Sequence, residues 1–295
     1  MIQNIKWKSV IPNIKEGDII TTFSSVISRL KFDCGWLPYL EDLEELATVK
    51  RKDNHKVGVY DKNGVQIIPE EFDECRLSIY YCSDFLVCAI EVQKQGMYGL
   101  YSEGGRVIVP VQYRRVDIQG NIIVVVDKNN LYGAYTTRGE QIINCEYDHI
   151  DYIAGPDIGC GCAVIRKDKL YGALAEDGSE IIPLKYGKIE SEHMGSGGYI
   201  VYDETKSQIK GWYSYDGRDI IPCVFQSIKF DMVNPHFEVE TPSKLKGIYS
   251  REGKEILPPR FKQLKYVGDF IVGLSEDNNL CVYNWQGTCL DNIKE

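Results

Sequence analysis

The chain has 295 residues, of which 43% are hydrophobic and 26% are charged, which excludes wholesale disorder and allows one large domain or two ordinary ones. The net charge of −9 argues against binding to nucleic-acid phosphates. No apolar run is long enough for a membrane helix, and the first residues do not read as a secretory leader. Together with ten cysteines that form no Cys-x-x-Cys pair, this predicts a cytoplasmic protein with buried, unbridged thiols and no membrane contact.

Residues 1–36 show little pattern and are interpreted as an N-terminal cap or extension. Residues 37–295 form the predicted repeat domain, in which a Gly is followed six residues later by a second Gly. A Tyr usually stands two residues after the first slot, a Pro eleven after it and a Phe or Tyr fourteen after it. The mean period is about 37 residues. The units begin near residues 58, 99, 133, 172, 211, 247 and 281.

Each unit predicts a four-stranded antiparallel meander. In the first copy, Val59-Tyr60 and Val65–Ile68 are strands, and Asp61-Lys62-Asn63-Gly64 is a type I turn with Gly in the left-handed conformation. The second strand is expected to stop at Pro, and the aromatic residue three positions later is expected to open a third strand. An apolar fourth strand follows. The first Gly lies within a strand and predicts a bulge or a close backbone approach.

The pattern resembles the WG-repeat (KWG-type) family of mostly bacterial proteins. The matching residues are Tyr98-Gly99-Leu100-Tyr101, Tyr132-Gly133-Ala134-Tyr135 and Tyr171-Gly172-Ala173-Leu174 with their Gly and Pro partners. Tyr, Lys or Val replaces the Trp before each Gly, Asn144 and Asn292 replace Pro, and Cys281 replaces Gly. The resemblance covers about residues 37–295. It implies a binding scaffold, in a family whose members have diverse functions.

A single meander cannot bury both of its faces, so the units are expected to stack. The last unit stops after two strands, and residues 37–50 read as the missing two. We therefore expect residues 37–50 to complete the last blade of a closed seven-bladed β-propeller. The alternative is an open β-solenoid array.

No catalytic, cofactor-binding or metal-ligating motif stands out. The four histidines share no metal spacing, and no nucleophile-elbow, zinc-protease or phosphate-loop motif occurs. The recurring tyrosines are expected to be core residues rather than ligand-stacking platforms. We expect no catalytic residue, no cofactor and no metal.

The longest units carry extra residues between the third and fourth strands. Insertions of this kind map to one rim and often form the contact surface. They combine aromatic residues with carboxylates, which suits a protein partner with a basic surface. The predicted partner-binding residues are Tyr80, Tyr81, Asp84, Asp151, Tyr152, Asp157, Glu190, Glu192 and His193.

Three functions of different classes are compatible with these features. The leading hypothesis is a non-enzymatic protein–protein interaction module, such as a bacterial immunity or defence-system adaptor protein that binds a basic partner. The second is a propeller that binds carbohydrate or another small ligand through repeated Tyr residues. The third is a hydrolase that uses a pair of carboxylates.

Overall fold

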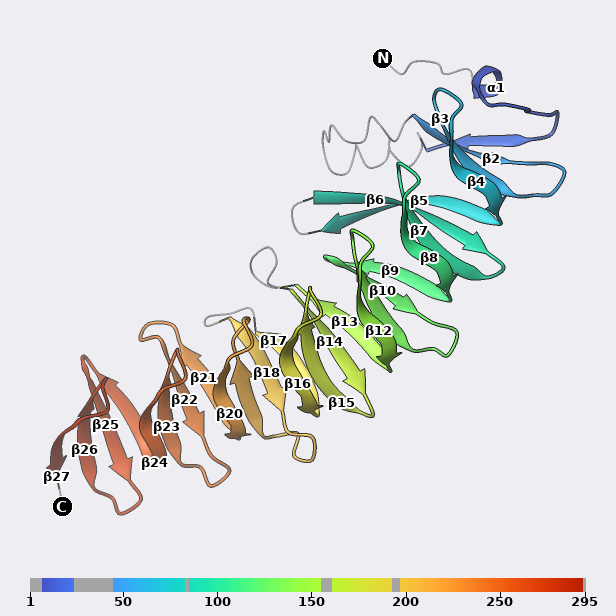
Figure 1. Ribbon diagram of the computed structural model, residues 1–295. Helices are drawn as coiled ribbons and strands as arrows, with labels where there is room; N and C mark the ends of the chain where they lie inside the picture. The colour runs from blue at the N-terminus through green and yellow to red at the C-terminus, as the bar shows by residue number, and fades with distance from the viewer. Residues whose placement is uncertain (1–6, 24–44, 83–84, 155–160, 193–196, 294–295) are drawn as a thin grey trace. The chain divides into compact units, whose positions relative to one another are not determined.

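The computed structural model describes residues 7–23, 45–82, 85–154, 161–192 and 197–293 (Figure 1). In this part of the chain, the regular elements are β-strands and one short helix, α1 (Trp7–Val10). The chain forms two compact units, residues 1–146 and residues 147–295, which are described separately. The predicted all-β repeat architecture is confirmed.

The first unit contains three four-stranded antiparallel sheets, each a meander of consecutive strands. The first sheet comprises β1 (Ile19–Thr22), β2 (Leu46–Lys50), β3 (Val57–Asp61) and β4 (Gln66–Phe72). The second comprises β5 (Glu74–Cys82), β6 (Phe85–Lys94), β7 (Met97–Ser102) and β8 (Val107–Tyr113). The third comprises β9 (Arg115–Gln119), β10 (Ile122–Val126), β11 (Tyr132–Thr136) and β12 (Gln141–Tyr147).

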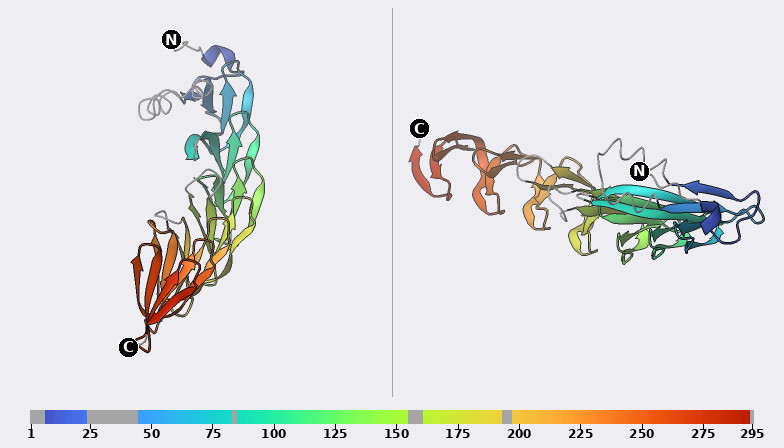
Figure 2. Two further views of the ribbon diagram at one scale, coloured as in Figure 1. Left: turned by 90° about the vertical axis from the view of Figure 1, so that its left-hand side faces the viewer. Right: turned by 90° about the horizontal axis from the view of Figure 1, so that it is seen from above.

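The second unit continues the same pattern, and two further views show the twist of the individual sheets (Figure 2). The fourth sheet comprises β13 (His149–Ile153), β14 (Cys162–Lys167), β15 (Leu170–Ala175) and β16 (Glu180–Tyr186). The fifth comprises β17 (Lys188–Glu192), β18 (Gly198–Tyr202), β19 (Lys210–Tyr213) and β20 (Asp219–Phe225). The remaining strands are β21 (Ser227–Asp231), β22 (His236–Glu240), β23 (Lys246–Ser250), β24 (Glu255–Val267), β25 (Phe270–Ser275), β26 (Leu280–Asn284) and β27 (Cys289–Ile293).

Strand β24 is long because it serves two meanders. Its first half pairs with β23 and its second half pairs with β25, so strands β21 to β27 form one seven-stranded sheet. We call β21 to β24 the sixth meander and β24 to β27 the seventh. The predicted seven meanders are therefore present in the described residues.

The boundaries of the meanders differ from the predicted ones by half a unit. A sheet begins with the third and fourth strands of one sequence copy and ends with the first and second strands of the next. The predicted strand break at Pro is also wrong: β8 runs through Pro110 to Tyr113, and the next strand starts at Arg115. The aromatic residue therefore closes the second strand instead of opening the third.

Residues 37–50 are predicted to complete the last blade. The strand pairings show that residues 46–50 do not do so. Strand β2 pairs with β1 on one side and with β3 on the other, so both of its edges are occupied within the first sheet. The seventh meander has four strands without it. Residues 37–44 lie outside the described residues, and closure into a ring stays a prediction. The predicted N-terminal cap contributes β1 to the first sheet.

The turn that follows the first strand of each copy is confirmed. The second-slot glycines have φ between +81° and +93°, as the left-handed position of the predicted turn requires. Five of them also touch the preceding sheet: a Cβ on Gly105 would lie 2.4 Å from the carbonyl oxygen of Ile67 in β4. The same approach joins Gly139 to Ile108, Gly217 to Ile181, Gly253 to Ile220 and Gly287 to Ile256. The glycine therefore sets both the turn and the spacing between sheets.

The glycine in the first slot lies at the predicted bulge. Around Gly99, Tyr98 pairs with Tyr113 and Leu100 pairs with Val109, so β8 carries extra residues opposite Gly99. A Cβ on Gly99 would lie 2.7 Å from the carbonyl oxygen of Val109.

The seventh sequence copy has no bulge opposite its first slot, which is occupied by Cys281 in place of Gly. There Cys281 pairs with Asn292 and Val282 with Asp291 in regular register. Because the strand opposite Cys281 does not bulge, neither Gly nor Pro is required at these two positions.

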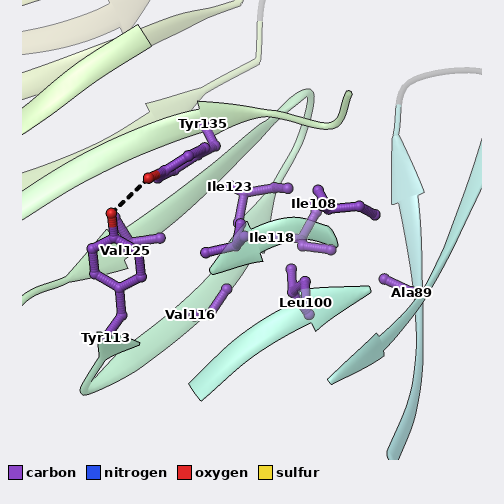
Figure 3. Packing of buried hydrophobic residues seen from close by; sticks show 10 residues of the cluster. Ala89, Leu100, Ile108, Tyr113, Val116, Ile118, Ile123, Val125 and Tyr135 are labelled. Carbon is purple, nitrogen blue, oxygen red and sulfur yellow. Dashed lines mark hydrogen bonds between the residues drawn. The ribbon is translucent and has the colours of Figure 1, made fainter. Parts of the chain in front are cut away.

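The hydrophobic cores lie between successive sheets, as expected for units that cannot stand alone. Between the second and third sheets, Leu100 and Ile108 face Val116 and Ile123 (Figure 3). Equivalent clusters join the first sheet to the second, the fourth to the fifth, the fifth to the sixth meander and the sixth to the seventh.

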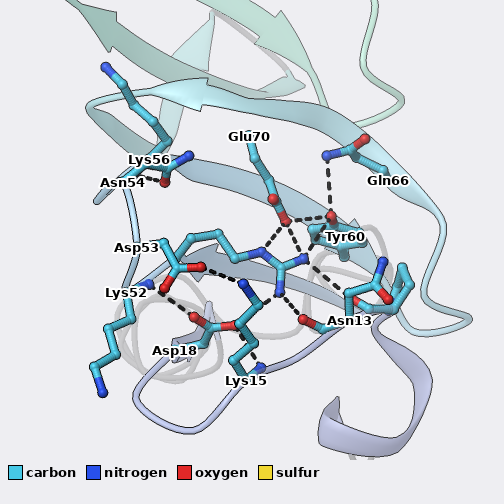
Figure 4. A network of polar contacts seen from close by, with 12 residues as sticks. Asn13, Lys15, Asp18, Lys52, Asp53, Asn54, Lys56, Tyr60, Gln66 and Glu70 are labelled. Carbon is cyan, nitrogen blue, oxygen red and sulfur yellow. Dashed lines mark hydrogen bonds and ion pairs between the residues drawn. The ribbon is translucent and has the colours of Figure 1, made fainter.

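An arginine ties the N-terminal segment to the first sheet (Figure 4). Arg51 Nη1 donates to Asp18 Oδ2 at 3.0 Å, and Arg51 Nε donates to Glu70 Oε1 at 2.7 Å. Its guanidinium also donates to the carbonyl oxygens of Pro12 and Asn13. The Arg51 side chain is 13% exposed, so this ion-pair network is shielded from water.

Candidate functional site

The recurring tyrosines are packing residues rather than a ligand-stacking surface. Tyr135, Tyr213, Tyr249 and Tyr283 are buried between sheets. Each of them, like the less buried Tyr101, contacts an aromatic residue in the last strand of the preceding sheet. The pairs are Phe72–Tyr101, Tyr113–Tyr135, Tyr186–Tyr213, Phe225–Tyr249 and Phe261–Tyr283, with ring centroids 5.6–5.9 Å apart and edge-on geometry. These tyrosines therefore do not provide the stacking platforms that the carbohydrate hypothesis requires.

The predicted partner-binding residues that the structure describes lie in strands rather than in inserted loops. Tyr80 and Tyr81 lie in β5, opposite Val87 and Leu86, so the extra residues lengthen a hairpin. They belong to the first unit. Asp84, Asp157 and His193 lie outside the described residues.

Two of the predicted residues, Asp151 and Tyr152, lie in β13. Asp151 is exposed and lies 3.0 Å from His149 Nε2. Tyr152 donates its hydroxyl to Glu176 Oε1 at 2.6 Å. Glu176 belongs to the turn between β15 and β16, so this bond joins two hairpins of the fourth sheet.

Glu190 and Glu192 lie in β17 of the fifth sheet. Lys188 and the Tyr202 hydroxyl both donate to the Glu190 carboxylate, and the Lys188 hydrogen bond lowers the pKa of Glu190. The main-chain oxygen of Glu192 accepts a hydrogen bond from the Tyr215 hydroxyl at 3.1 Å. The structure thus places the four described residues of the second unit on neighbouring sheets, where they have internal partners.

The second unit has one edge at which two kinds of turn meet. In each meander of this unit, the hairpin between the first and second strands and the Gly turn between the third and fourth strands lie at the same end. We call this end the turn edge; it comprises residues 175–180, 192, 214–219, 231–236, 250–255, 267–270 and 284–289. The contacts of Gly217, Gly253 and Gly287 with the preceding sheets align these ends along the unit.

The turn edge is acidic. Its cations are Arg218, Arg251 and Lys254, and Arg218 pairs with Asp216. Its carboxylates are Glu176, Asp177, Glu180, Glu192, Asp216, Asp219, Asp231, Glu252, Glu255 and Asp269. Hydrogen bonds lower the pKa of several of them: Ser179 acts on Asp177, Ser214 on Asp216 and the Asn234 amide on Asp231. These groups carry negative charge across the physiological pH range.

The opposite edge of the second unit carries a different mixture. Lysines stand at its hairpins and strand ends beside a comparable number of carboxylates. They include Lys167, Lys169, Lys185, Lys188, Lys206, Lys210, Lys244, Lys246 and Lys262. Charge is therefore segregated along the strands, with the negative excess at the turn edge.

A cavity of about 380 Å³ lies between the fourth and fifth sheets and is lined by Lys185, Asp203, Asp219 and Cys223, among others. The Cys223 thiol contacts the carbonyl oxygens of Val201 and Ile209. Burial raises its pKa to about 11, so at neutral pH it is a protonated thiol rather than a nucleophile. The thiol in this cavity is therefore not activated.

Metal-ligating residues do not cluster in the part of the chain that the structure describes: no three His, Cys, Asp or Glu side chains are arranged to hold an ion. Among the described cysteines, Cys162 and Cys281 are buried and Cys289 is exposed, and none forms a disulfide. No helix among the described residues could span a bilayer.

Sequence comparison returns no matching family model and no matching curated protein. Solved structures similar to this chain include the computationally designed Ika8 protein (12% identity, 84% of each chain, TM-score 0.26). They also include BamB from Moraxella catarrhalis (11% identity, 84% of this chain and 82% of that chain, TM-score 0.28). A third is the WD40 β-propeller domain of Doa1 (11% identity, 85% of this chain and 90% of that chain, TM-score 0.25). These TM-scores are too low to support an inference about the function of this chain.

Proposed function

We propose that the chain is a non-enzymatic protein-binding module whose turn edge in the second unit binds a partner with a basic surface. The observation that supports this most directly is the excess of carboxylates at that edge, where Glu180, Glu252 and Asp269 are exposed. Fixed charges on a packed repeat scaffold accelerate encounter with an oppositely charged protein and select against acidic ones.

The narrower part of the proposal concerns family and biological role. The Gly, Tyr and Pro spacing supports membership of the WG-repeat family, and the net charge of −9 supports a basic partner. On these two grounds we propose a bacterial, cytoplasmic role as an immunity or defence-system adaptor protein. The presence of a basic toxin gene next to the gene for this chain would support the immunity role, and neighbouring sugar-utilisation genes would contradict it.

The test is charge reversal at the turn edge. The variant Glu180→Lys with Glu252→Lys changes two exposed carboxylates in different sheets. Binding to a labelled peptide rich in Lys and Arg is measured by fluorescence anisotropy at low and at high salt. We expect the variant to weaken binding by about tenfold at low salt, and high salt to weaken binding of the unmodified protein.

The matched control is Glu204→Lys with Asp277→Lys, which makes the same change of net charge on exposed carboxylates at the opposite edge. This control is expected to weaken binding by no more than about twofold, because the charges lie about a Debye length or more from the turn edge. Equal losses in both variants would show that only net charge matters and would contradict the proposal. Failure of the unmodified protein to bind at low salt would also contradict it.

A further inference from the structure

Two neighbouring hairpin tips at the turn edge carry exposed apolar side chains. In the tip between β21 and β22, Met232 is 72% exposed and Val233 is 87% exposed. In the tip between β24 and β25, Val267 is 58% exposed and Phe270 is 46% exposed. Most large apolar side chains of the described residues are buried between sheets, so this concentration at one place requires an explanation.

Ring contacts hold the two tips side by side within the second unit. The ring of His236, which begins β22, lies 5.0 Å from that of Tyr266, the residue before Val267. Both rings contact Trp285 in the last Gly turn, at 4.9 Å and 5.7 Å. The exposed residues of the two tips therefore belong to one surface, which we call the apolar tip patch and define as Met232, Val233, Val267 and Phe270.

Polar contacts fix the first tip in place. The Asp231 carboxylate accepts hydrogen bonds from the main-chain amides of Val233 and Asn234 at 2.8 and 3.1 Å. Beneath the tips, Tyr266 donates its hydroxyl to Glu238 at 2.8 Å. Lys246 lies 2.7 Å from the same carboxylate group. A patch held in this way loses little conformational entropy when a partner docks on it.

The third sheet shows that a hairpin of this kind does not require exposed apolar residues. Its tip, Gln119-Gly120-Asn121-Ile122, has the same length as Val267-Gly268-Asp269-Phe270, and the end residues pair in the same way. There the first position is the polar Gln119, and Ile122 is fully buried. The exposed Val267 and Phe270 are thus not imposed by the geometry of the turn.

The patch is bordered by negative charge. Asp231 and Asp269 lie within the two tips, and the acidic turn edge continues on the neighbouring turns. An apolar centre with a charged surround is the usual anatomy of a protein–protein interface. Its complement is an apolar side chain with cationic neighbours.

We propose that the apolar tip patch anchors the partner by receiving an aliphatic or aromatic side chain that is flanked by Lys or Arg in the partner's sequence. The inference rests on the proposed function, because it specifies where on the acidic edge the basic partner docks. Charge brings the partner to the edge, and burial of the apolar side chain fixes its register there.

The test uses two labelled peptides of equal charge, one with Leu between basic residues and one with Ser in its place. Anisotropy titrations compare the unmodified chain with the double variant Val233→Ser, Val267→Gln, where Gln is the residue of the third-sheet tip. The control is Val224→Gln in β20, since Val224 is 54% exposed but lies near the opposite edge. Thermal unfolding of all three proteins verifies that each is folded.

We expect the unmodified chain and the control to bind the Leu peptide about tenfold more tightly than the Ser peptide. The double variant should bind both peptides equally, at the affinity of the Ser peptide. A Leu preference that survives in the double variant would overturn the inference, as would equal binding of both peptides by the unmodified chain. If the Glu180→Lys, Glu252→Lys variant still binds both peptides more weakly than the unmodified chain does, the proposed function stands without the inference.

Binding of neither peptide by the unmodified chain would contradict both proposals together. Sedimentation measurements test whether a second copy of the chain, instead of a basic partner, occupies the patch. If the unmodified chain dimerises and the double variant is a monomer, a second copy of the chain covers the patch and the proposal of a basic partner there is wrong.

Discussion

The hydroxyl oxygens of Tyr113 and Tyr135 lie 2.7 Å apart, although Tyr113 ends β8 of the second sheet and Tyr135 lies in β11 of the third. Their rings meet edge-on at 5.9 Å. In other copies Phe replaces the first Tyr, and the ring contact remains at 5.8 Å between Phe225 and Tyr249. The ring contact is therefore the common link between sheets, and the hydroxyl bond is an addition to it.

Because the ring contact is the common link, we expect Tyr113→Phe to lower the free energy of unfolding only slightly. The substitution keeps the ring contact and removes the hydrogen bonds of the Tyr113 hydroxyl with Tyr135 and with the side-chain amide of Gln112, while Tyr135 keeps its contact with Gln141 at 3.3 Å. We expect the free energy of unfolding to fall by about 1 kcal/mol, against about 3–5 kcal/mol for Tyr113→Ala. Urea unfolding followed by circular dichroism measures both values. Equal losses in the two variants would show that the hydroxyl bond, rather than the ring, joins the sheets.

The second prediction separates the two roles of a turn glycine. Gly105 has φ +82° and lies against Ile67 of the preceding sheet, whereas Gly96 has φ +77° with no atom near its missing Cβ. Gly96→Ala should therefore cost only the backbone strain, about 1 kcal/mol. Gly105→Ala should cost at least about 2 kcal/mol more, because the sheets must also move apart. Unfolding of the two variants in urea decides this, and similar losses would refute a spacing role for Gly105.

Local chemistry made most of the fold predictable. The Gly turn, the bulge opposite Gly99 and the burial of the recurring tyrosines follow from backbone conformation and apolar pattern. The boundaries of the sheets did not follow, because a periodic sequence has no intrinsic starting point. The same ambiguity made residues 37–50 look like the missing half of the last unit, when β2 in fact pairs with β1, a strand from the poorly patterned N-terminal segment.

The candidate site was less predictable than the fold. Inserted residues directed attention to Tyr152 and Glu190, whose polar groups have internal partners. The apolar tip patch was missed because its tips are short, and exposure depends on how neighbouring sheets pack. A signal existed in the sequence: Val267 and Phe270 flank a two-residue Gly-Asp turn, where the third sheet has Gln119 and Ile122.

The third prediction concerns the attachment of the N-terminal segment through Arg51. In Arg51→Gln, Asp18 loses its cationic partner and Glu70 retains only the Tyr60 hydroxyl. Removing one partner of a shielded ion pair leaves the other charges uncompensated. We expect the segment around Lys15 to be cleaved by trypsin several-fold faster than in the unmodified protein. The control is Arg76→Gln, whose ion pair with Glu74 is exposed and contributes little; unchanged cleavage in Arg51→Gln would contradict the prediction.

The same attachment should depend on acidity. Main-chain amides of Lys15 and Lys52, together with Arg51, lower the pKa of Asp18 to about 2 from an ordinary value of 3.8. Because the folded-state pKa is the lower one, the contribution of Asp18 to stability is complete above about pH 4 and is lost as the pH falls towards 2. Pulse-labelling hydrogen exchange should show the amide of Lys52 losing protection in that range. Full protection at pH 2 would contradict this assignment.

The last prediction concerns the thiols. Burial raises the pKa of Cys223 and of Cys162 to about 11, whereas Cys289 is exposed. Only the thiolate reacts with alkylating reagents, so near pH 8 Cys289 should be modified at least about a hundredfold faster than Cys223. The rate at Cys223 should rise by about tenfold per pH unit, because the thiolate fraction grows as the pH approaches 11. Mass spectrometry of peptides after timed labelling measures each site, with Cys289→Ser as the control that removes its signal. Rapid labelling of Cys223 near pH 8 would show an activated thiol beside Lys185 and would favour a catalytic role for that cavity.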